Sequence, residues 1–400
     1  MSDPAGSRAH RAVVDSLAEV ALVDQHCHGM LATALGPDDR NQFRRLCTES
    51  DDARLLADVP TALAYRRMLR ALAVHLDCAS DEESVLRARG EREPLAHAAE
   101  LLSDAGIRTL LLDDGYPPAD AVLRPALLEQ RAKVTTHRVL RLEPQFERML
   151  GTGIRSVDEA RERVRALVRE ARGAGVVGLK TVAGYRTGLG IRRPDPAAAT
   201  ASFDVVQAEL DAHGSVRLGH KALLDTLLLD AFEVAGAEQL PVQVHVGYGD
   251  TDADLRTASP LELRDVLEDR RLSATQFVLL HGCWPFVREG AYLAGVYGNA
   301  WLDISYGIPF LSRRELVEVT RAAIGVAPLS RIVYSSDGSS LPELHWSGAR
   351  EGRHAIATAL GGAVDDGDLD LSHAVRYGQA MLAGTASRLY GLDEHQAPVP

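Results

Sequence analysis

The sequence predicts an α/β fold, a (β/α)8 TIM barrel with a helical insertion after its first strand. Eight short apolar runs, each ending in polar residues or glycine, recur along the 400 residues. Such runs are typical of parallel strands that are buried on both faces. Segments of helical periodicity separate most of the runs, and strands that alternate with helices favour a parallel sheet. Eight such units favour a closed barrel over an open doubly wound sheet, which is the alternative.

Each predicted strand contains a short run of aliphatic residues and ends in a polar residue, a cysteine, a proline or a glycine. Helical periodicity covers residues 156–173 and 200–236, and two further helices are expected within 354–392. Residues 195–201 (DPAAATA) are expected to form a loop. The strands are ALVDQHCH (21–28), RTLLLDDG (108–115), THRVLRLEP (136–144), VVGLKTVAG (176–184), PVQVHVG (241–247), QFVLLHGC (276–283), AWLDISYG (300–307) and RIVYSSDG (331–338).

The stretch between the first two strands, residues 31–105, is too long for a single connection. Its composition is largely helical, as in TALAYRRMLRALAVHL. Long loops on the catalytic face of a barrel often cover its mouth, so we expect a helical insertion in that position. A barrel with insertions commonly reaches this length as one domain, and we expect a single domain over residues 1–400.

Composition restricts the classes of partner. The hydrophobic fraction of 46% and the charged fraction of 25% are ordinary for a globular protein. The net charge of −12 argues against nucleic acid, whose phosphates would be repelled. No apolar run approaches the roughly 18–20 residues that span a bilayer. The four cysteines form no CxxC pair, which favours reduced thiols and a cytoplasmic location. We expect a small-molecule substrate, with a homo-oligomer as one possible assembly.

The strongest chemical signal is the pair His26 and His28 at the end of the first predicted strand. Residues two apart in a strand point to the same side, so both imidazoles are expected to face the barrel interior. Such a pair alone is weak evidence, because it is common on surfaces. His245, His281 and Asp337 also lie at strand ends, each after an apolar run. We therefore predict that these residues bind one or two divalent cations, with Zn²⁺ favoured because it prefers imidazole and carboxylate ligands.

Lys180 closes the fourth predicted strand of a chain whose only other lysines are Lys133 and Lys221. A charged ammonium is unfavourable to bury unless it is paired. A lysine amine, unlike a guanidinium, deprotonates readily and can react with carbon dioxide to give a carbamate. Lys180 is predicted to bridge two metals as a carbamate, or to act as an unmodified amine that binds substrate or pairs with Asp337. A core lysine without a chemical role is the simplest alternative.

Further residues at the same rim are candidates for substrate binding. Arg186 is expected to grip a substrate carboxylate, because its planar guanidinium can bind two oxygens together. The alternative for Arg186 is a salt bridge to a rim acid such as Asp250 or Glu143. Trp284 is expected either to line the pocket or to pack in the core. The remaining candidates are Tyr185, Asp114 and Glu143.

Long blocks of the sequence resemble one known family. They are LLLDDG (110–115), RVLRLEP (138–144), LKTVAGYRTGLGI (179–191), VQVHVGYGDTDADL (242–255), the stretch 279–312 and RIVYSSDGSSLPELHWSGA (331–349). They are similar to the amidohydrolase domain at the front of nodulin/FluG-type proteins, over about residues 20–392. The resemblance implies a metal-dependent TIM barrel of the amidohydrolase superfamily, with ligands at His26, His28, His245 and Asp337, and also at His281.

The resemblance does not fix the reaction, because the superfamily also contains decarboxylases and isomerases. In nodulin/FluG-type proteins a glutamine-synthetase-like domain usually follows. The printed chain ends at residue 400, so we expect no such partner domain. Functions that depend on that fusion are therefore not expected here.

Together these residues predict a metal-dependent hydrolase that cleaves a C–N, amide-type bond of a small, carboxylate-bearing substrate. A bound cation would lower the pKa of a water molecule from 15.7 towards about 7. Asp337 would accept the proton and deliver it to the leaving amine, and His281, if it is not a ligand, would polarise the scissile carbonyl. One alternative is a metal-dependent decarboxylase of an aromatic or unsaturated carboxylic acid. A second is a non-catalytic metal-binding regulatory module.

Overall fold

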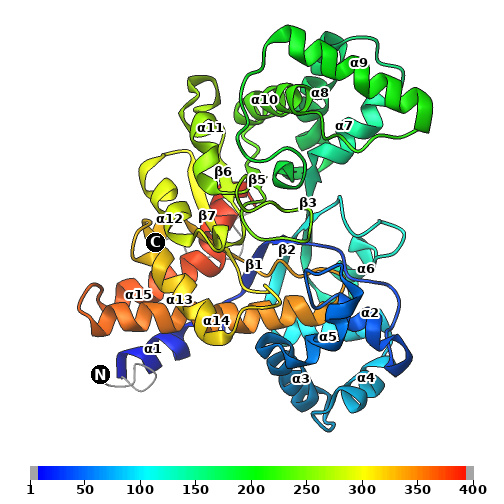
Figure 1. Cartoon of the computed structure of the whole chain (residues 1–400). Helices are drawn as coiled ribbons and strands as arrows, with labels where there is room; N and C mark the ends of the chain where they lie inside the picture. The colour runs from blue at the N-terminus through cyan, green and yellow to red at the C-terminus, as the bar shows by residue number, and fades with distance from the viewer. Residues whose placement is uncertain (1–7, 393–400) are drawn as a thin grey trace. The chain divides into compact units, whose positions relative to one another are not determined.

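The computed structural model describes residues 8–392, and its strands form one eight-stranded sheet in the order β1 to β8. Sequential parallel strands that alternate with helices are the pattern of a (β/α)8 barrel, and the predicted fold class is confirmed (Figure 1). The chain divides into two compact units, which are described in turn. Among the described residues, the first comprises 8–137 and 303–392, and the second comprises Arg138–Leu302.

The first unit contains β1, β2 and β8. β1 (Leu22–Cys27) pairs in parallel with β2 (Ile107–Asp113). Every residue of β1 and of β8 (Ile332–Ser335) is buried, as the apolar runs predict. In the chain, α1 (Arg8–Leu17) precedes β1, and α6 (Pro125–Ala132) follows β2.

The segment between β1 and β2 is helical, which confirms the predicted insertion. The Asp81 carboxylate caps the first turn of one helix by accepting a hydrogen bond from the Ser84 amide at 2.9 Å. Another helix begins with Pro94, whose fixed φ suits a first turn. The α-helices of the insertion are α2 (Arg40–Arg45), α3 (Leu63–Leu76), α4 (Glu82–Gly90) and α5 (Pro94–Asp104).

The C-terminal helices begin earlier than predicted. The sequence pattern predicted two helices within 354–392, but a long helix already starts at Pro342, where proline fits the first turn. The prediction missed it because the preceding residues were assigned to the end of the eighth strand. The helices of this part are α13 (Arg313–Ile324), α14 (Pro342–Asp365), α15 (Leu371–Gln379) and α16 (Thr385–Tyr390).

In the second unit, consecutive strands from β3 to β7 pair in parallel. Two differences from the prediction concern where helices begin. β3 ends at Arg141, so Glu143 lies in the first turn of a helix and not at a strand end. The predicted loop at 195–201 is also wrong, because a helix begins at Pro196. The Asp195 carboxylate caps this helix by accepting a hydrogen bond from the Ala197 amide at 2.7 Å. The strands are β3 (Thr135–Arg141), β4 (Val176–Thr181), β5 (Val242–Val244), β6 (Phe277–Leu279) and β7 (Ala300–Ser305).

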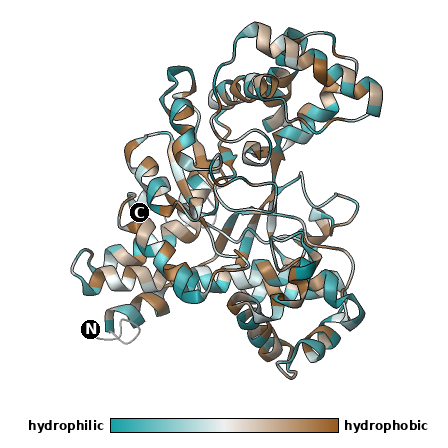
Figure 2. Ribbon diagram, in the orientation of Figure 1, coloured by the Kyte–Doolittle hydropathy of each residue, from teal (hydrophilic) through white to brown (hydrophobic). Residues whose placement is uncertain are grey.

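The helices of the second unit bury one face against their neighbours. In α8 the buried residues Ala160, Val164, Val168 and Ala171 recur at helical spacing, while the opposite face is rich in arginine and glutamate. Figure 2 shows this mixture of hydrophobic and hydrophilic residues along the helices. The helices are α7 (Leu142–Leu150), α8 (Val157–Ala171), α9 (Pro196–His213), α10 (Lys221–Ala237), α11 (Arg264–Glu268) and α12 (Val287–Val296).

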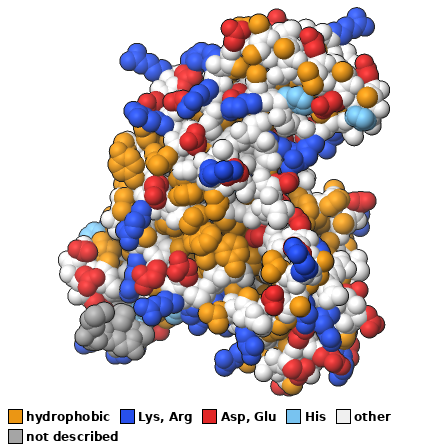
Figure 3. All heavy atoms as spheres, in the orientation of Figure 1, with side chains coloured by type: hydrophobic (Ala, Val, Ile, Leu, Met, Phe, Trp, Pro, Cys, Tyr) orange, Lys and Arg blue, Asp and Glu red, His pale blue; other side chains and the backbone are white. Residues whose placement is uncertain are grey.

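The surface carries charges of both signs. Acidic and basic side chains are interspersed over the face seen in Figure 3. Within residues 8–392, none of the helices combines the length and the apolarity that a bilayer crossing requires.

Candidate metal centre

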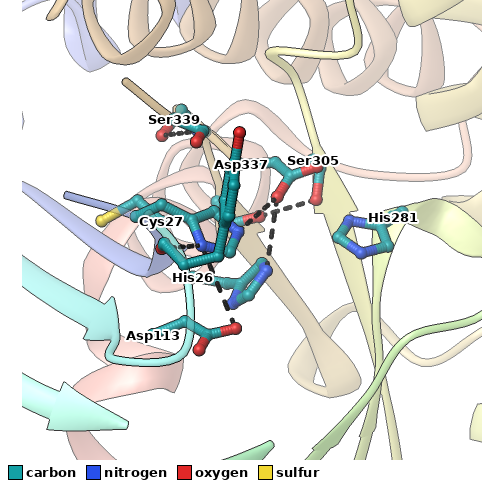
Figure 4. A network of polar contacts seen from close by, with 12 residues as sticks. His26, Cys27, Asp113, His281, Ser305, Asp337 and Ser339 are labelled. Carbon is teal, nitrogen blue, oxygen red and sulfur yellow. Dashed lines mark hydrogen bonds and ion pairs between the residues drawn. The ribbon is translucent and has the colours of Figure 1, made fainter. Parts of the chain in front are cut away.

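Three donor atoms converge in the first unit. The Nε2 atom of His26 lies 3.3 Å from the Oδ1 atom of Asp337, and the Nε2 atom of His28 lies 3.6 Å from the same oxygen (Figure 4). One ligand atom of each residue lies within 4.8 Å of the others. Zinc bonds to imidazole nitrogen and carboxylate oxygen are about 2.0–2.2 Å long, so these separations suit a shared ion.

The backbone brings the two chain segments together. The Asp337 amide donates to the His26 carbonyl at 3.0 Å, and the His28 amide donates to the Gly338 carbonyl at 2.8 Å. These hydrogen bonds fix the segment after β8 beside the carboxyl end of β1. Asp337 has a φ of 54°, a left-handed conformation that residues other than glycine rarely adopt. Such conformations cluster at functional sites, where the surrounding structure enforces them.

His28 is oriented by a hydrogen bond on the far side of its ring. Its Nδ1 atom lies 3.0 Å from the Tyr116 carbonyl oxygen. A carbonyl oxygen only accepts, so Nδ1 carries the hydrogen and, in the neutral ring, Nε2 presents a lone pair toward Asp337. Histidine ligands of metals are commonly oriented in this way. With a neutral His28, lone pairs face one another at this point, and a cation would relieve that repulsion.

Two neighbouring acids differ in their placement. Asp113 is buried, and its Oδ2 atom lies 4.0 Å from the Nδ1 atom of His28. Asp114, the predicted substrate residue, is exposed. The sequence shows two adjacent acids, Asp113 and Asp114, and does not by itself indicate which of them faces His28. The structure points to Asp113.

The second unit brings His245 and His281 together. The Nε2 atom of His281 lies 2.9 Å from the Nδ1 atom of His245, whose Nε2 atom lies 2.6 Å from the Tyr248 carbonyl oxygen. Since that carbonyl accepts from Nε2, a neutral His245 receives the His281 hydrogen at Nδ1. The Tyr185 ring packs on His245, with ring centroids 4.3 Å apart. That His245 and His281 bind metal stays a prediction from the sequence.

The other predicted residues of the second unit are partly or fully buried. Lys180 is 1% exposed in β4, and its metal or substrate role stays a prediction. The Nη2 atom of Arg186 lies 3.1 Å from the Oε1 atom of Glu147, a salt bridge to a residue that the prediction did not name. Glu143 is fully buried and accepts hydrogen bonds from the Thr181 hydroxyl and the Val182 amide. Trp284 is half-buried, and its contact with a substrate also stays a prediction.

Burial shifts the pKa of two of these side chains. Burial raises the pKa of Glu143, although the two hydrogen bonds oppose the shift. Burial also lowers the pKa of the Arg186 guanidinium, which Glu147 partly offsets. The carboxylate of Glu143 and the guanidinium of Arg186 are thus held by their own protein neighbours.

Comparison with known proteins gives one family and several relatives. The family model described as amidohydrolase matches residues 23–392. Protein fluG of Emericella nidulans is 27% identical over 403 residues, which cover 93% of this chain and 46% of fluG. The chain therefore spans about half the length of this curated relative.

Solved structures share the fold over nearly the whole chain. A Lactobacillus casei protein, provisionally assigned as a metal-dependent hydrolase, is 28% identical with a TM-score of 0.86, covering 97% of this chain and 99% of that one. A uronate isomerase from Bacillus halodurans is 14% identical with a TM-score of 0.65, covering 98% of each chain. A fold that is shared with an isomerase does not determine the reaction.

Proposed function

Because this chain belongs to the amidohydrolase family, we propose that it is a metal-dependent hydrolase that cleaves a C–N, amide-type bond of a small substrate. The observation that carries the proposal is the convergence of His26, His28 and Asp337 within 4.8 Å. Two imidazoles and a carboxylate suit a catalytic Zn²⁺ site that keeps a position for water. The sequence predicts that Arg186 binds a substrate carboxylate. In the structure Arg186 forms a salt bridge with Glu147, so a carboxylate on the substrate stays a prediction.

When bound, the cation would supply a water of lowered pKa and polarise a carbonyl oxygen. His26 and His28 would hold it as neutral ligands, and the Tyr116 carbonyl keeps the His28 hydrogen on Nδ1. Asp337 is the most exposed of the three side chains, at 16% against 0% and 10% for the histidines. It is therefore the donor best placed to take a proton from the water and pass it to the leaving amine.

The test uses the full chain loaded with Zn²⁺ and a panel of N-acyl amino acids, with released amine and released carbon dioxide measured in parallel. Asp337→Asn should lower kcat by at least about 100-fold, because a positioned general acid–base contributes about 10²–10⁴-fold. Asp366→Asn, on an exposed carboxylate of the same unit, is the matched control and should retain the wild-type rate.

The metal is measured separately from turnover. We expect at least one zinc per wild-type chain, and a loss of one zinc in His28→Asn. An Asp337→Asn enzyme that turns over within about threefold of wild type would contradict the assigned proton transfer. Release of carbon dioxide without release of amine would show that the enzyme is a decarboxylase and not a hydrolase.

A further inference from the structure

A second group of metal-ligating side chains lies in the first unit. Asp24 and Cys27 belong to β1, and His345 belongs to α14. One ligand atom from each lies within 4.8 Å of the other two, and all three residues are buried. The Nδ1 atom of His345 lies 3.9 Å from the Oδ2 atom of Asp24. None of the three belongs to the His26, His28 and Asp337 group.

Polar atoms of this group lack hydrogen-bond partners among residues 8–392. They are the Oδ2 atom of Asp24 and both ring nitrogens of His345. The hydroxyl of Tyr334, which interacts electrostatically with Asp24 and Cys27, is likewise buried without a partner in the described chain. Nearly all buried polar atoms in proteins have a partner, so several in one place point to a ligand.

The strand geometry explains how Asp24 and Cys27 meet. Residues three apart in a regular strand point to opposite faces. The pairing of β1 with β2 shifts register between Asp24 and Cys27, which breaks this alternation. The Oδ1 atom of Asp24 accepts a hydrogen bond from the Ser336 amide at 2.8 Å, which leaves Oδ2 for another partner. Figure 4 shows Cys27 next to His26 at the end of this strand.

The charges of these groups fit a dication. A carboxylate, a thiolate and a neutral imidazole around a doubly charged ion sum to zero, which suits a fully buried site. A bound dication would neutralise the buried carboxylate and thiolate, which water cannot stabilise in this position.

We propose that Asp24, Cys27 and His345 form a second, structural cation site for a thiophilic dication of the Zn²⁺ type. The donor set of one sulfur, one nitrogen and one oxygen is one that Zn²⁺ accepts. This site is separate from the proposed catalytic function and does not depend on it.

The probe is Co²⁺, whose bond to a thiolate gives a near-ultraviolet charge-transfer absorption. The full chain, stripped of metal and titrated with Co²⁺, should develop this absorption as the cobalt content rises. Cys27→Ser should abolish the absorption and lower the cobalt content by one per chain. Cys47→Ser, which changes another buried thiol of the same unit, is the control and should keep both.

Two further measurements keep the outcome decisive. His28→Asn should lose one cobalt and any hydrolysis but retain the thiolate absorption, so that failure of the proposed function is distinguishable. X-ray absorption of the zinc-loaded wild-type chain should show a sulfur neighbour at about 2.3 Å, a result that needs no variant to fold. Wild-type protein saturated with Co²⁺ that shows no thiolate absorption, or a zinc spectrum without sulfur, would overturn the second site.

Discussion

The buried ion pair between Arg89 and Glu343 ties the helical insertion to α14, and we expect it to stabilise the fold. The Nε atom of Arg89, on α4, lies 2.5 Å from the Oε1 atom of Glu343, and the two side chains are 5% and 0% exposed. The Nε2 atom of His97 lies 2.9 Å from the same oxygen. Glu343→Gln keeps the shape of the side chain but leaves the Arg89 guanidinium buried without a countercharge.

The cost of this change follows both from the loss of the ion pair and from the pKa of Glu343. Breaking a buried ion pair by removing one partner destabilises a protein by about 3–5 kcal/mol. Burial alone would raise the pKa of Glu343, but Arg89 and His97 outweigh it and lower the pKa from 4.5 to about 2. Such a shift corresponds to about 3 kcal/mol, since one pKa unit is about 1.4 kcal/mol. We expect Glu343→Gln to lower the free energy of unfolding by about 3 kcal/mol at pH 7.

The pH dependence of the free energy of unfolding tests the same ion pair independently. The pKa of Glu343 is lower in the folded state, so its contribution is complete above about pH 4.5 and is lost as the pH falls through about 2. Urea unfolding followed by circular dichroism should therefore show the gap between wild type and variant narrowing as the pH falls below about 4.5.

The matched control lies on α4, the helix that carries Arg89. Glu83→Gln removes the exposed pair with Arg87, whose side chains are 57% and 60% exposed, and should cost less than about 1 kcal/mol. A loss for Glu343→Gln no larger than this control, or a gap that is independent of pH, would refute the ionic account.

Three further predictions concern other parts of the chain. Asp230→Asn should lower the free energy of unfolding in urea by about 2 kcal/mol, because buried Asp230 pairs with Arg161 at 2.7 Å and with Arg165 at 2.9 Å. Its control, Asp158→Asn, changes a side chain that is 92% exposed and should have no measurable effect. Burial raises the pKa of Glu143, so its charged form opposes folding above that pKa; Glu143→Gln should raise the urea midpoint at alkaline pH, and the gain should vanish in acid. Chelation of bound dications should lower the unfolding free energy by about 3 kcal/mol relative to a free-metal concentration of about 100 times Kd, and added Zn²⁺ should reverse the loss in calorimetry.

The apolar runs were sufficient to predict the strands and their order, because strands buried on both faces need little besides aliphatic side chains. Boundaries next to such runs were harder. In THRVLRLEP the strand ends at Arg141, and Leu142 begins α7. Glu143 and Pro144 suit a first helical turn, where an acidic side chain and a proline are both favourable. The apolar pattern continues across the junction, so periodicity alone does not reveal it.

The same unpredicted helix supplies the salt-bridge partner of Arg186. Its partner Glu147 lies on α7, three residues beyond the end of the predicted third strand at Pro144. A residue on an unpredicted helix was not among the rim acids that the sequence offered as partners. By contrast, His26, His28 and Asp337 were predicted from strand ends alone, and the structure brings them together because hydrogen bonds join the ends of β1 and β8.

The segment Asp337-Gly338 explains why His345 was not predicted from the sequence. His345 lies on a helix, outside every strand end, and no local pattern marks it. A Cβ atom on Gly338 would lie 2.5 Å from a ring carbon of His345, so only glycine lets this ring pack against the segment. The adjoining Asp337 is held in its left-handed conformation by its amide hydrogen bond to the His26 carbonyl. Gly338 therefore lets His345 reach the buried side of β1, whereas the backbone hydrogen bond to His26 holds Asp337 beside the histidine pair. The approach of His345 also requires the packing of α14, which no local pattern in the sequence predicts.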